Sequence, residues 1–277
     1  MPVRIGTNVS SLVARNRLNE SFENREHALR SLASGKRVVN ASDDAAGFAI
    51  SENLRGQKHG IQMSQRNTQD AISFVQVAEG SLNEQNNILI RMRELAIQSA
   101  SDTVSDKERS FLNKEFKQLS QELDRIANST SFGRSKLLNG EEKSFQFQVG
   151  PNSGDSDRIE YDLTADARAS SLGVARISVD KKRSALRSMD NIDKAIDKVS
   201  SMRADFGAIQ SRLHTASSHL MNQHESISAA HSQMADTDVA QATAKLAQAN
   251  ILSEIGVAVL AQANSNPHYA QRLILSL

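Results

Sequence analysis

An unbroken heptad pattern across residues 54–96 constrains the fold more than any other feature of the chain. Its members follow one another at alternating steps of three and four, which places them on one stripe of a helix. They are Leu54, Gln57, Ile61, Ser64, Thr68, Ala71, Val75, Ala78, Leu82, Gln85, Leu89, Met92 and Ala96. The pattern predicts a helix of about 50 residues, roughly 75 Å long, in which polar stripe positions fix the register.

Three other segments carry helical patterns of their own. Residues 105–108, Ser-Asp-Lys-Glu, have the capping-box sequence, and the apolar residues from Leu112 to Ile126 fall on one helical face. The short loop before this second helix predicts that it packs antiparallel to the first. A further long helix is expected from near Asp180, and residues 18–32 carry a separate apolar stripe.

The pattern changes between residues 131 and 178, where apolar and polar residues alternate on two arms around the turn-forming sequence PNSGDSD. Alternation with a period of two on both arms predicts a β-hairpin. The alternating apolar residues are Phe145, Phe147 and Val149 on the first arm, and Ile159, Tyr161 and Leu163 on the second.

The closing stretch, residues 239–277, contains three charged residues, Lys245, Glu254 and Arg272. A helix so poor in charge is expected to be buried against other helices rather than to face water. Its partner within the chain is the N-terminal segment 1–33, with which it is expected to form an antiparallel pair. The predicted fold class is mainly α: a long antiparallel helical bundle or coiled coil, a small β-hairpin region, and paired N- and C-terminal helices.

The composition fits long helices with narrow seams, because aromatic residues make up only 4% of the chain and there are three prolines. The net charge of +1 provides no strong field for nucleic acid or anionic lipid, so no nucleic-acid partner is expected. The N-terminus lacks the apolar core of a signal peptide. The best apolar run, residues 251–263, is shorter than the ~20 residues that span a bilayer. The chain is therefore expected to be cytosolic or to leave the cell by a route that needs no cleaved signal peptide, and no membrane insertion is expected.

Candidate chemical sites are few. His214, His219 and His224 are five residues apart, a spacing that scatters them around a helix instead of gathering them at a metal. Asp43 and Asp44 stand at the start of a helix, where carboxylates cap free amide groups and complement the dipole. The sequence contains no phosphate-binding glycine loop, nucleophile elbow or cysteine. No catalytic residue, cofactor or metal ligand is expected, and the chain is predicted not to be an enzyme.

Five stretches of the chain resemble those of bacterial flagellins. They are SLASGKRVVNASDDAAG (31–47), RNTQDAISFVQVAEGSLNE (66–84), RMRELAIQSAS (91–101), FGRSKLLNG (132–140) and LAQANILSEIGVAVLAQAN (246–264). Several long motifs at matching spacing leave chance agreement negligible. The resemblance covers both ends of the chain and leaves only its middle outside.

The resemblance implies a secreted filament subunit that leaves the cell through the flagellar type III apparatus. It implies an inner coiled-coil tube domain from residues 1–33 with 239–277, and a connector at 34–46. An outer tube domain follows from residues 47–130, the β region 131–178 and residues 179–238. The residues expected to carry assembly are Leu18, Phe22, Leu29, Leu32, Leu246, Leu252, Ile255, Val259 and Leu260.

The partners implied are further copies of the chain, a flagellar export chaperone, the export apparatus, and hook-associated and cap proteins. Arg91, Leu95 and Glu115 match positions that flagellins use at the flagellin-sensing Toll-like receptor, and they also suit contacts between subunits. The expected function is polymerisation into the flagellar filament for swimming motility. Two alternatives stay open: a hook–filament junction protein of the same superfamily, and a cytosolic coiled-coil binding module with ordered ends.

Overall fold

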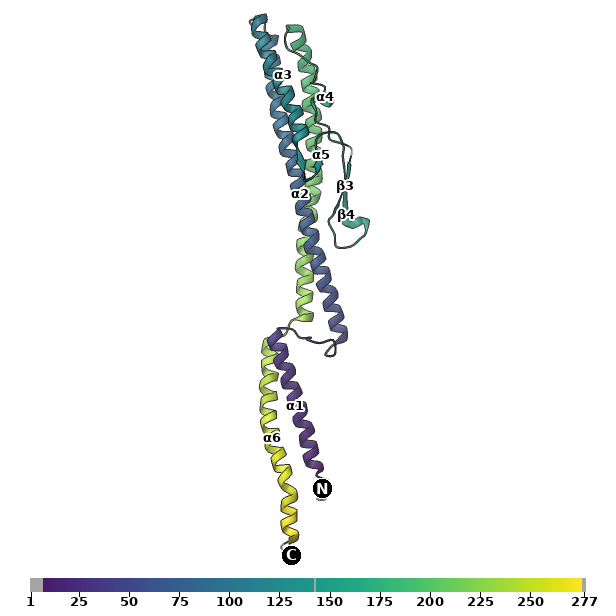
Figure 1. Ribbon diagram of the computed structural model, residues 1–277, viewed down its shortest axis with the longest axis vertical. Helices are drawn as coiled ribbons and strands as arrows, with labels where there is room; N and C mark the ends of the chain where they lie inside the picture. Colours follow the sequence, from purple (N-terminus) through teal and green to yellow (C-terminus); the bar gives the residue numbers. More distant parts are fainter. Residues whose placement is uncertain (1–6, 142, 276–277) are drawn as a thin grey trace. The chain divides into compact units, whose positions relative to one another are not determined.

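The computed structural model describes residues 7–141 and 143–275 (Figure 1). Its elements, in chain order, are α1 (Val9–Ser34), α2 (Ala45–Ala100), α3 (Asp106–Ser129), β1 (Ser131–Phe132), β2 (Ser135–Lys136), β3 (Lys143–Gln148), the 3-10 turn η1 (Asp155–Asp157), β4 (Arg158–Leu163), α4 (Ala169–Leu172), α5 (Lys182–Ala235) and α6 (Val239–Leu275). Long helices with a small antiparallel hairpin confirm the predicted fold class.

The chain divides into two compact units. The terminal unit contains Met1–Gly56 and Ser226–Leu277, and the central unit contains Gln57–Glu225. The helices α2 and α5 each contribute residues to both units. The filament layers expected from the sequence, with limits at residues 33, 46 and 238, concern the assembled state and stay predictions.

The heptad stripe of α2 runs through the core of the central unit. Every stripe residue from Ile61 to Ala96 is buried, which confirms the seam over most of its length. Its first two members depart from the prediction, since Leu54 is half-buried and Gln57 is exposed. The central unit begins at Gln57, so its core starts one turn later, at Ile61.

Polar stripe residues make specific hydrogen bonds inside this core. Gln85 is completely buried, and its Nε2 donates to the backbone oxygens of Leu123 and Ala167, both at 3.1 Å. The hydroxyl of Thr68 donates to the Ser64 oxygen of its own helix at 2.8 Å. Because the Gln85 amide must reach two fixed carbonyl groups, its bonds disfavour other registers of α2.

The capping box at the start of α3 is present as predicted. The Ser105 amide donates to Glu108 Oε2 at 2.7 Å, and the Glu108 amide donates to Ser105 Oγ at 3.4 Å. The hydrogen bond from the Ser105 backbone holds the pKa of Glu108 below its usual value. Further along the helix, Phe116 and Leu123 are completely buried, so the predicted apolar face packs into the core.

The hairpin of β3 and β4 has the predicted alternation, with Phe145 opposite Tyr161. It packs on both long helices of the central unit. The Phe74 ring of α2 lies 4.9 Å from Phe145 and 5.6 Å from Phe147, between ring centroids, and Tyr161 lies 5.5 Å from Phe206 of α5. Burial, followed by the charge of Asp205, raises the pKa of Tyr161 to about 12. The aromatic contacts explain why this β region needs no separate domain.

A second, shorter hairpin pairs β1 with β2. The alternation pattern does not predict it, because strands of two residues are too short to show a period. Its turn contains Gly133 at φ +58°, a left-handed conformation that glycine adopts without strain.

In the terminal unit, α1 and α6 lie side by side and antiparallel, which confirms the pairing of the chain's end helices (Figure 1). Asn8 Nδ2 donates to the Ala263 oxygen at 2.7 Å, and the Ser11 hydroxyl donates to Asn264 Oδ1 at 2.6 Å. These bonds join the start of α1 to the second half of α6. We call α1 and α6 the terminal helix pair.

The first 27 residues of α6, Val239–Ser265, are long and apolar enough to cross a membrane by length and composition alone. This segment is longer than the apolar run read from the sequence, because residues 239–250, which are mainly alanine and glutamine, extend it on the N-terminal side. Length and composition do not distinguish a membrane span from a helix that other protein chains cover. Only 17% of its apolar 18-residue window is buried inside the chain, so most of the surface of that window is available to a partner.

Candidate functional site: the terminal helix pair

The connector after α1 is hydrogen-bonded to the end of α5 and to the chain segment between α5 and α6. Gly35 ends α1 at φ +67°, and its oxygen accepts from the Thr237 amide at 2.9 Å. The Arg37 amide donates to the Ala235 oxygen at 2.7 Å, and the Arg37 guanidinium donates twice to the Met234 oxygen, at 3.0 and 3.1 Å. The last carbonyl groups of α5 are therefore satisfied by the chain that leaves α1.

The two aspartates of the connector have structural roles, as predicted, but only one caps the helix. Asp44 Oδ1 accepts from the Gly47 amide at 2.9 Å at the start of α2. Asp43 Oδ2 instead accepts from the Asn40 amide at 2.9 Å and lies 3.8 Å from His27 Nε2. The Asn40 hydrogen bond, aided by the charges of His27 and Arg30, holds the pKa of Asp43 below its usual value. Asp43 therefore closes a turn.

The seam of the terminal helix pair consists mainly of small residues. On α6 between Val239 and Asn264, and on α1 apart from the additional buried residue Ser31, the buried and half-buried positions recur at alternating steps of three and four. Between Val239 and Asn264 every residue outside this set is exposed. The seam residues are Ser11, Ala14, Leu18, Ser21, Arg25, Ala28 and Leu32 on α1, and Ala242, Leu246, Ala249, Ser253, Gly256, Leu260 and Ala263 on α6.

The nine residues expected to carry assembly do not share one environment. Four of them belong to the seam within the chain: Leu18 is buried, and Leu32, Leu246 and Leu260 are half-buried. The other five are exposed on the helices, namely Phe22 (39%), Leu29 (48%), Leu252 (47%), Ile255 (53%) and Val259 (51%). The apolar stripe expected over residues 18–32 is therefore divided: Leu18 and Leu32 face α6, whereas Phe22 and Leu29 remain exposed.

The exposed apolar residues form two flanks on opposite sides of the seam. Phe22 and Leu29 each follow a seam residue on α1, whereas Leu252 and Val259 each precede one on α6. In an antiparallel pair, residues that follow seam positions on one helix and residues that precede seam positions on the other helix lie on opposite sides of the seam. We call Phe22 and Leu29 the first flank, and Leu252 and Val259, with the neighbouring Ile255, the second flank.

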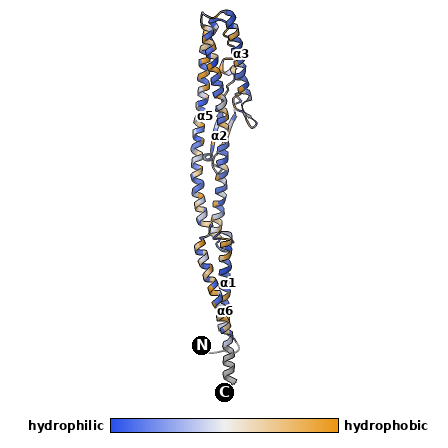
Figure 2. Cartoon of the chain, turned by 90° about the vertical axis from the view of Figure 1, so that its left-hand side faces the viewer, coloured by the Kyte–Doolittle hydropathy of each residue, from blue (hydrophilic) through white to orange (hydrophobic). Residues whose placement is uncertain are grey.

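Several further apolar residues of the pair are exposed but were not predicted as assembly residues. Hydrophobic colour recurs along both helices of the pair in Figure 2. Each of these further residues is between 45% and 62% exposed. For those on α6, the available signal was the low charge of residues 239–277. The further residues on both helices are Val9, Leu12, Val13, Val239, Ile251 and Val257.

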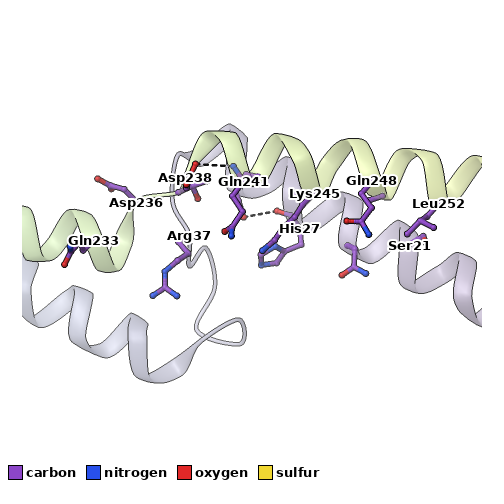
Figure 3. Close-up of a pocket in the computed structure, with 16 residues that line it drawn as sticks. Ser21, His27, Arg37, Gln233, Asp236, Asp238, Gln241, Lys245, Gln248 and Leu252 are labelled. Carbon is purple, nitrogen blue, oxygen red and sulfur yellow. Dashed lines mark hydrogen bonds between the residues drawn. The ribbon is translucent and has the colours of Figure 1, made fainter.

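A cavity of about 550 Å³ lies beside the seam, between α1, the connector and the start of α6 (Figure 3). Its lining is mostly polar and mixes cationic groups, Arg37 and Lys245, with the carboxylates of Asp236 and Asp238. Asp238 is already used, because its Oδ1 accepts from the amide of Gln241 at 3.1 Å and caps α6. The cavity reaches Leu252, so it continues along the second flank.

Of the three residues expected at a receptor-type surface, Arg91 and Glu115 are solvent-accessible and Leu95 is not. Arg91 donates from Nε and Nη2 to Glu115 Oε1, at 3.1 and 2.9 Å, and from Nη1 to Glu94 at 2.9 Å. The bonds to Glu94, then Glu115, raise the pKa of Arg91 above its usual value. Leu95 is completely buried and belongs to the core, so its assignment to this surface is wrong. Glu94, which the sequence analysis did not name, is the second carboxylate that accepts a hydrogen bond from Arg91.

The histidines of α5 stay apart from one another as expected. His214 and His219 are exposed, and the ring of His224 lies 3.3 Å from the side-chain nitrogen of Gln62. Across residues 7–141 and 143–275 no three His, Cys, Asp or Glu side chains gather in a way that could hold a metal ion.

Comparisons with known proteins agree at both ends of the chain. Residues 5–143 match the family model described as the bacterial flagellin N-terminal helical region, and residues 189–274 match the bacterial flagellin C-terminal helical region. Flagellin of Halalkalibacterium halodurans is 39% identical over 271 residues, covering 98% of this chain and 99% of the relative. Flagellin of Bacillus subtilis is 34% identical over 309 residues, covering 98% of this chain and all of the relative.

Solved structures with similar folds agree with these matches. The crystal structure of Bacillus cereus flagellin superposes with a TM-score of 0.50 at 32% identity, over 56% of this chain and 88% of that one. A putative flagellar hook-associated protein from Vibrio parahaemolyticus superposes with a TM-score of 0.59 over 70% of this chain and all of that one, but its 14% identity shows a shared fold alone. The family models and the near full-length relatives identify the protein: the chain belongs to the bacterial flagellin family.

Proposed function

We propose that the chain is the structural subunit of a bacterial flagellar filament and polymerises through its terminal helix pair. The observation that carries this proposal is the presence of two exposed apolar flanks on opposite sides of one seam. A surface that meets its own copy closes a two-fold dimer, whereas two different surfaces join head to tail and generate rings or open helical filaments. The first flank of one copy is proposed to pack against the second flank of the next.

Small seam residues support a link between assembly and ordering of the terminal helices. A seam of alanine, serine and glycine buries little apolar area, and burial of such area is the main term that stabilises a helix pair. The larger apolar residues, among them Phe22 and Leu252, remain outside the seam. The pair therefore reaches its full stability only when neighbouring copies cover both flanks.

Negative-stain electron microscopy of purified chain, before and after salting-out with sheared filament seeds, tests the proposal. Long uniform filaments are expected. Short closed rings would instead favour a junction protein of the same superfamily, and discrete oligomers that do not extend would favour a coiled-coil binding module. Either of these two results contradicts the proposed function.

We further propose that the chain is exported without a cleaved signal peptide through the flagellar type III apparatus, with a chaperone covering α6 before export. Cap and hook-associated proteins are the proposed neighbours at the filament ends. The charge-poor surface of α6 supports this proposal, because an uncovered apolar helix aggregates at the concentrations of a cell. Mass measurement of the secreted chain should give the uncleaved N-terminus, and secretion should cease when the flagellar export apparatus is deleted. A shortened N-terminus or continued secretion would refute this route.

The surface around Arg91 and Glu115 is proposed as a contact for the flagellin-sensing Toll-like receptor. The support is geometric: both side chains are solvent-accessible and are held in place by their mutual hydrogen bonds. Arg91→Ala should lower receptor activation by the monomer at least tenfold, while Arg93→Ala, which removes a comparable ion pair with Asp193, serves as the control. Equal activation by both variants and by the unaltered chain would exclude this surface.

A further inference from the structure

At one position in the seam of the terminal helix pair, an added methyl group would press against the side chain that faces it. A Cβ atom built on Gly256 of α6 would lie 3.0 Å from Leu18 Cδ1 of α1, and 3.7 and 3.8 Å from Leu18 Cβ and Cγ. Carbon atoms attract best at about 3.5–4.0 Å, so the closest of these distances is repulsive. The Leu18 side chain therefore rests on the bare backbone of Gly256.

The other large seam residues also face small ones. Counting outward from the Leu18 contact along two antiparallel helices brings Leu260 opposite Ala14, and Leu246 opposite Ala28. These leucines meet residues that carry a Cβ atom, whereas Leu18 meets a residue that has none. The pair thus has an alternation of large and small residues with one position of closest approach.

This position distinguishes the observed register from its nearest alternatives. A slip of one heptad moves one helix along the other by roughly 10 Å and keeps the seam pattern in phase. Such a slip would place Leu18 opposite Ala249 or Ala263, and both of these residues carry the Cβ atom that Gly256 lacks. The other seam residues are mostly small, so their packing opposes a slip only weakly, and the hydrogen bonds from Asn8, Ser11 and Thr237 hold the same register at the two ends of the pair.

We infer that Gly256 is a positioning residue that fixes the register of α1 against α6, and with it the relative placement of the two apolar flanks. The inference rests on the proposed function, because the flanks matter only if copies of the chain meet through them. A slipped pair would displace the first flank along the second by two helical turns. Neighbouring copies would then present surfaces that no longer match.

Substitution of Gly256 by alanine separates this inference from an effect of helix propensity. Alanine is the better helix former, so propensity alone predicts that Gly256→Ala assembles as well as the unaltered chain or better. The register role predicts the opposite: the critical concentration for polymerisation should rise at least tenfold. Gly80→Ala is the matched control, since Gly80 is also helical and no described atom lies within 4 Å of its added Cβ.

A compensating substitution on α1 tests whether the cause is Leu18. Leu18→Val with Gly256→Ala moves one methylene group across the seam and conserves the total volume, which packed cores tolerate best. The double variant should polymerise at a critical concentration within threefold of the unaltered chain. Coupling of this size between the two sites marks direct contact, because effects at independent sites add.

The chain has no cysteine, so introduced thiols can report the register directly. Ser11→Cys with Asn264→Cys replaces two side chains whose oxygens lie 2.6 Å apart, and a short cross-linker with two thiol-reactive maleimide groups should link them within one chain. The link should form efficiently with Gly256 present and fall at least fivefold when Gly256→Ala is added to the same background. A shift of roughly 10 Å exceeds the reach of such a reagent.

The outcomes separate the register role from the proposed function. Assembly of Gly256→Ala at the concentration of the unaltered chain would overturn the register role and leave the filament function standing. An assembly defect that Leu18→Val does not relieve would also overturn it. If the unaltered chain fails to polymerise, the filament function fails, and the thiol link in the unpolymerised chain still decides the register.

Discussion

Leu252→Asp abolishes polymerisation and leaves the central unit folded. Leu252 is 47% exposed, so the substitution disturbs little within one chain. In an assembled filament it would bury a carboxylate without a partner, at a cost of about 3 kcal/mol or more at each contact. That cost corresponds to a rise of roughly a hundredfold or more in the critical concentration. Pelleting of polymer over a range of chain concentrations measures it.

Two further variants control this prediction. Val259→Asp lies one heptad further along the same flank, so it should give the same loss of polymer. Leu252→Met keeps the size and the apolar character of the side chain, so it should polymerise normally. Normal filaments from either aspartate variant would show that the second flank is not a contact between copies.

Phe116→Ala should destabilise the central unit by about 3–5 kcal/mol, the usual cost of emptying a buried phenylalanine site. The ring of Phe116 is completely buried on the core face of α3. Tyrosine fluorescence during urea unfolding measures the effect in a Tyr269→Phe background. Tyr161 is then the sole tyrosine, and it reports on the central unit through its contact with Phe206.

Phe111→Ala on the same helix is the matched control. The Phe111 ring is 55% exposed, and Lys114 Nζ lies 5.6 Å from its centroid. Its loss should cost less than about 1 kcal/mol, as for an exposed cation–π contact. Equal destabilisation by the two substitutions would contradict the assignment of the core face of α3.

The sequence was sufficient for features that repeat or that depend on local chemistry. The heptad stripe of α2 persists over ten turns, and this length makes the period unambiguous. The Ser105 capping box is a local exchange of hydrogen bonds, and the β3–β4 hairpin follows from alternation on two arms. None of these features depends on contacts that are distant in the chain.

The terminal helix pair was harder to predict because small residues, and not the large apolar ones, form most of the contact between its two helices. Large apolar residues ordinarily mark one packed face of a helix, so Phe22 and Leu29 were assigned to the same stripe as Leu18 and Leu32. In this pair the seam is built from alanine, serine and glycine, and much of the apolar surface points outward. The spacing of the small residues at steps of three and four was the available signal.

Leu95 shows a second limit. A motif resemblance identifies which residues a family uses, but it does not tell whether a side chain lies on the surface or supports it from below. Leu95 belongs to the core beside the heptad stripe, one residue before Ala96, whereas Arg91 and Glu94 on the same helix are exposed. Burial of this kind depends on α3 and α5, which are distant in sequence.

Cryo-electron microscopy of filaments grown from the purified chain tests most directly whether the terminal helix pair carries assembly. The account predicts that Phe22 and Leu29 of one copy pack against Leu252 and Val259 of a neighbouring copy, with all four side chains buried. Filaments in which these four side chains face solvent, while copies meet through other surfaces, would contradict it.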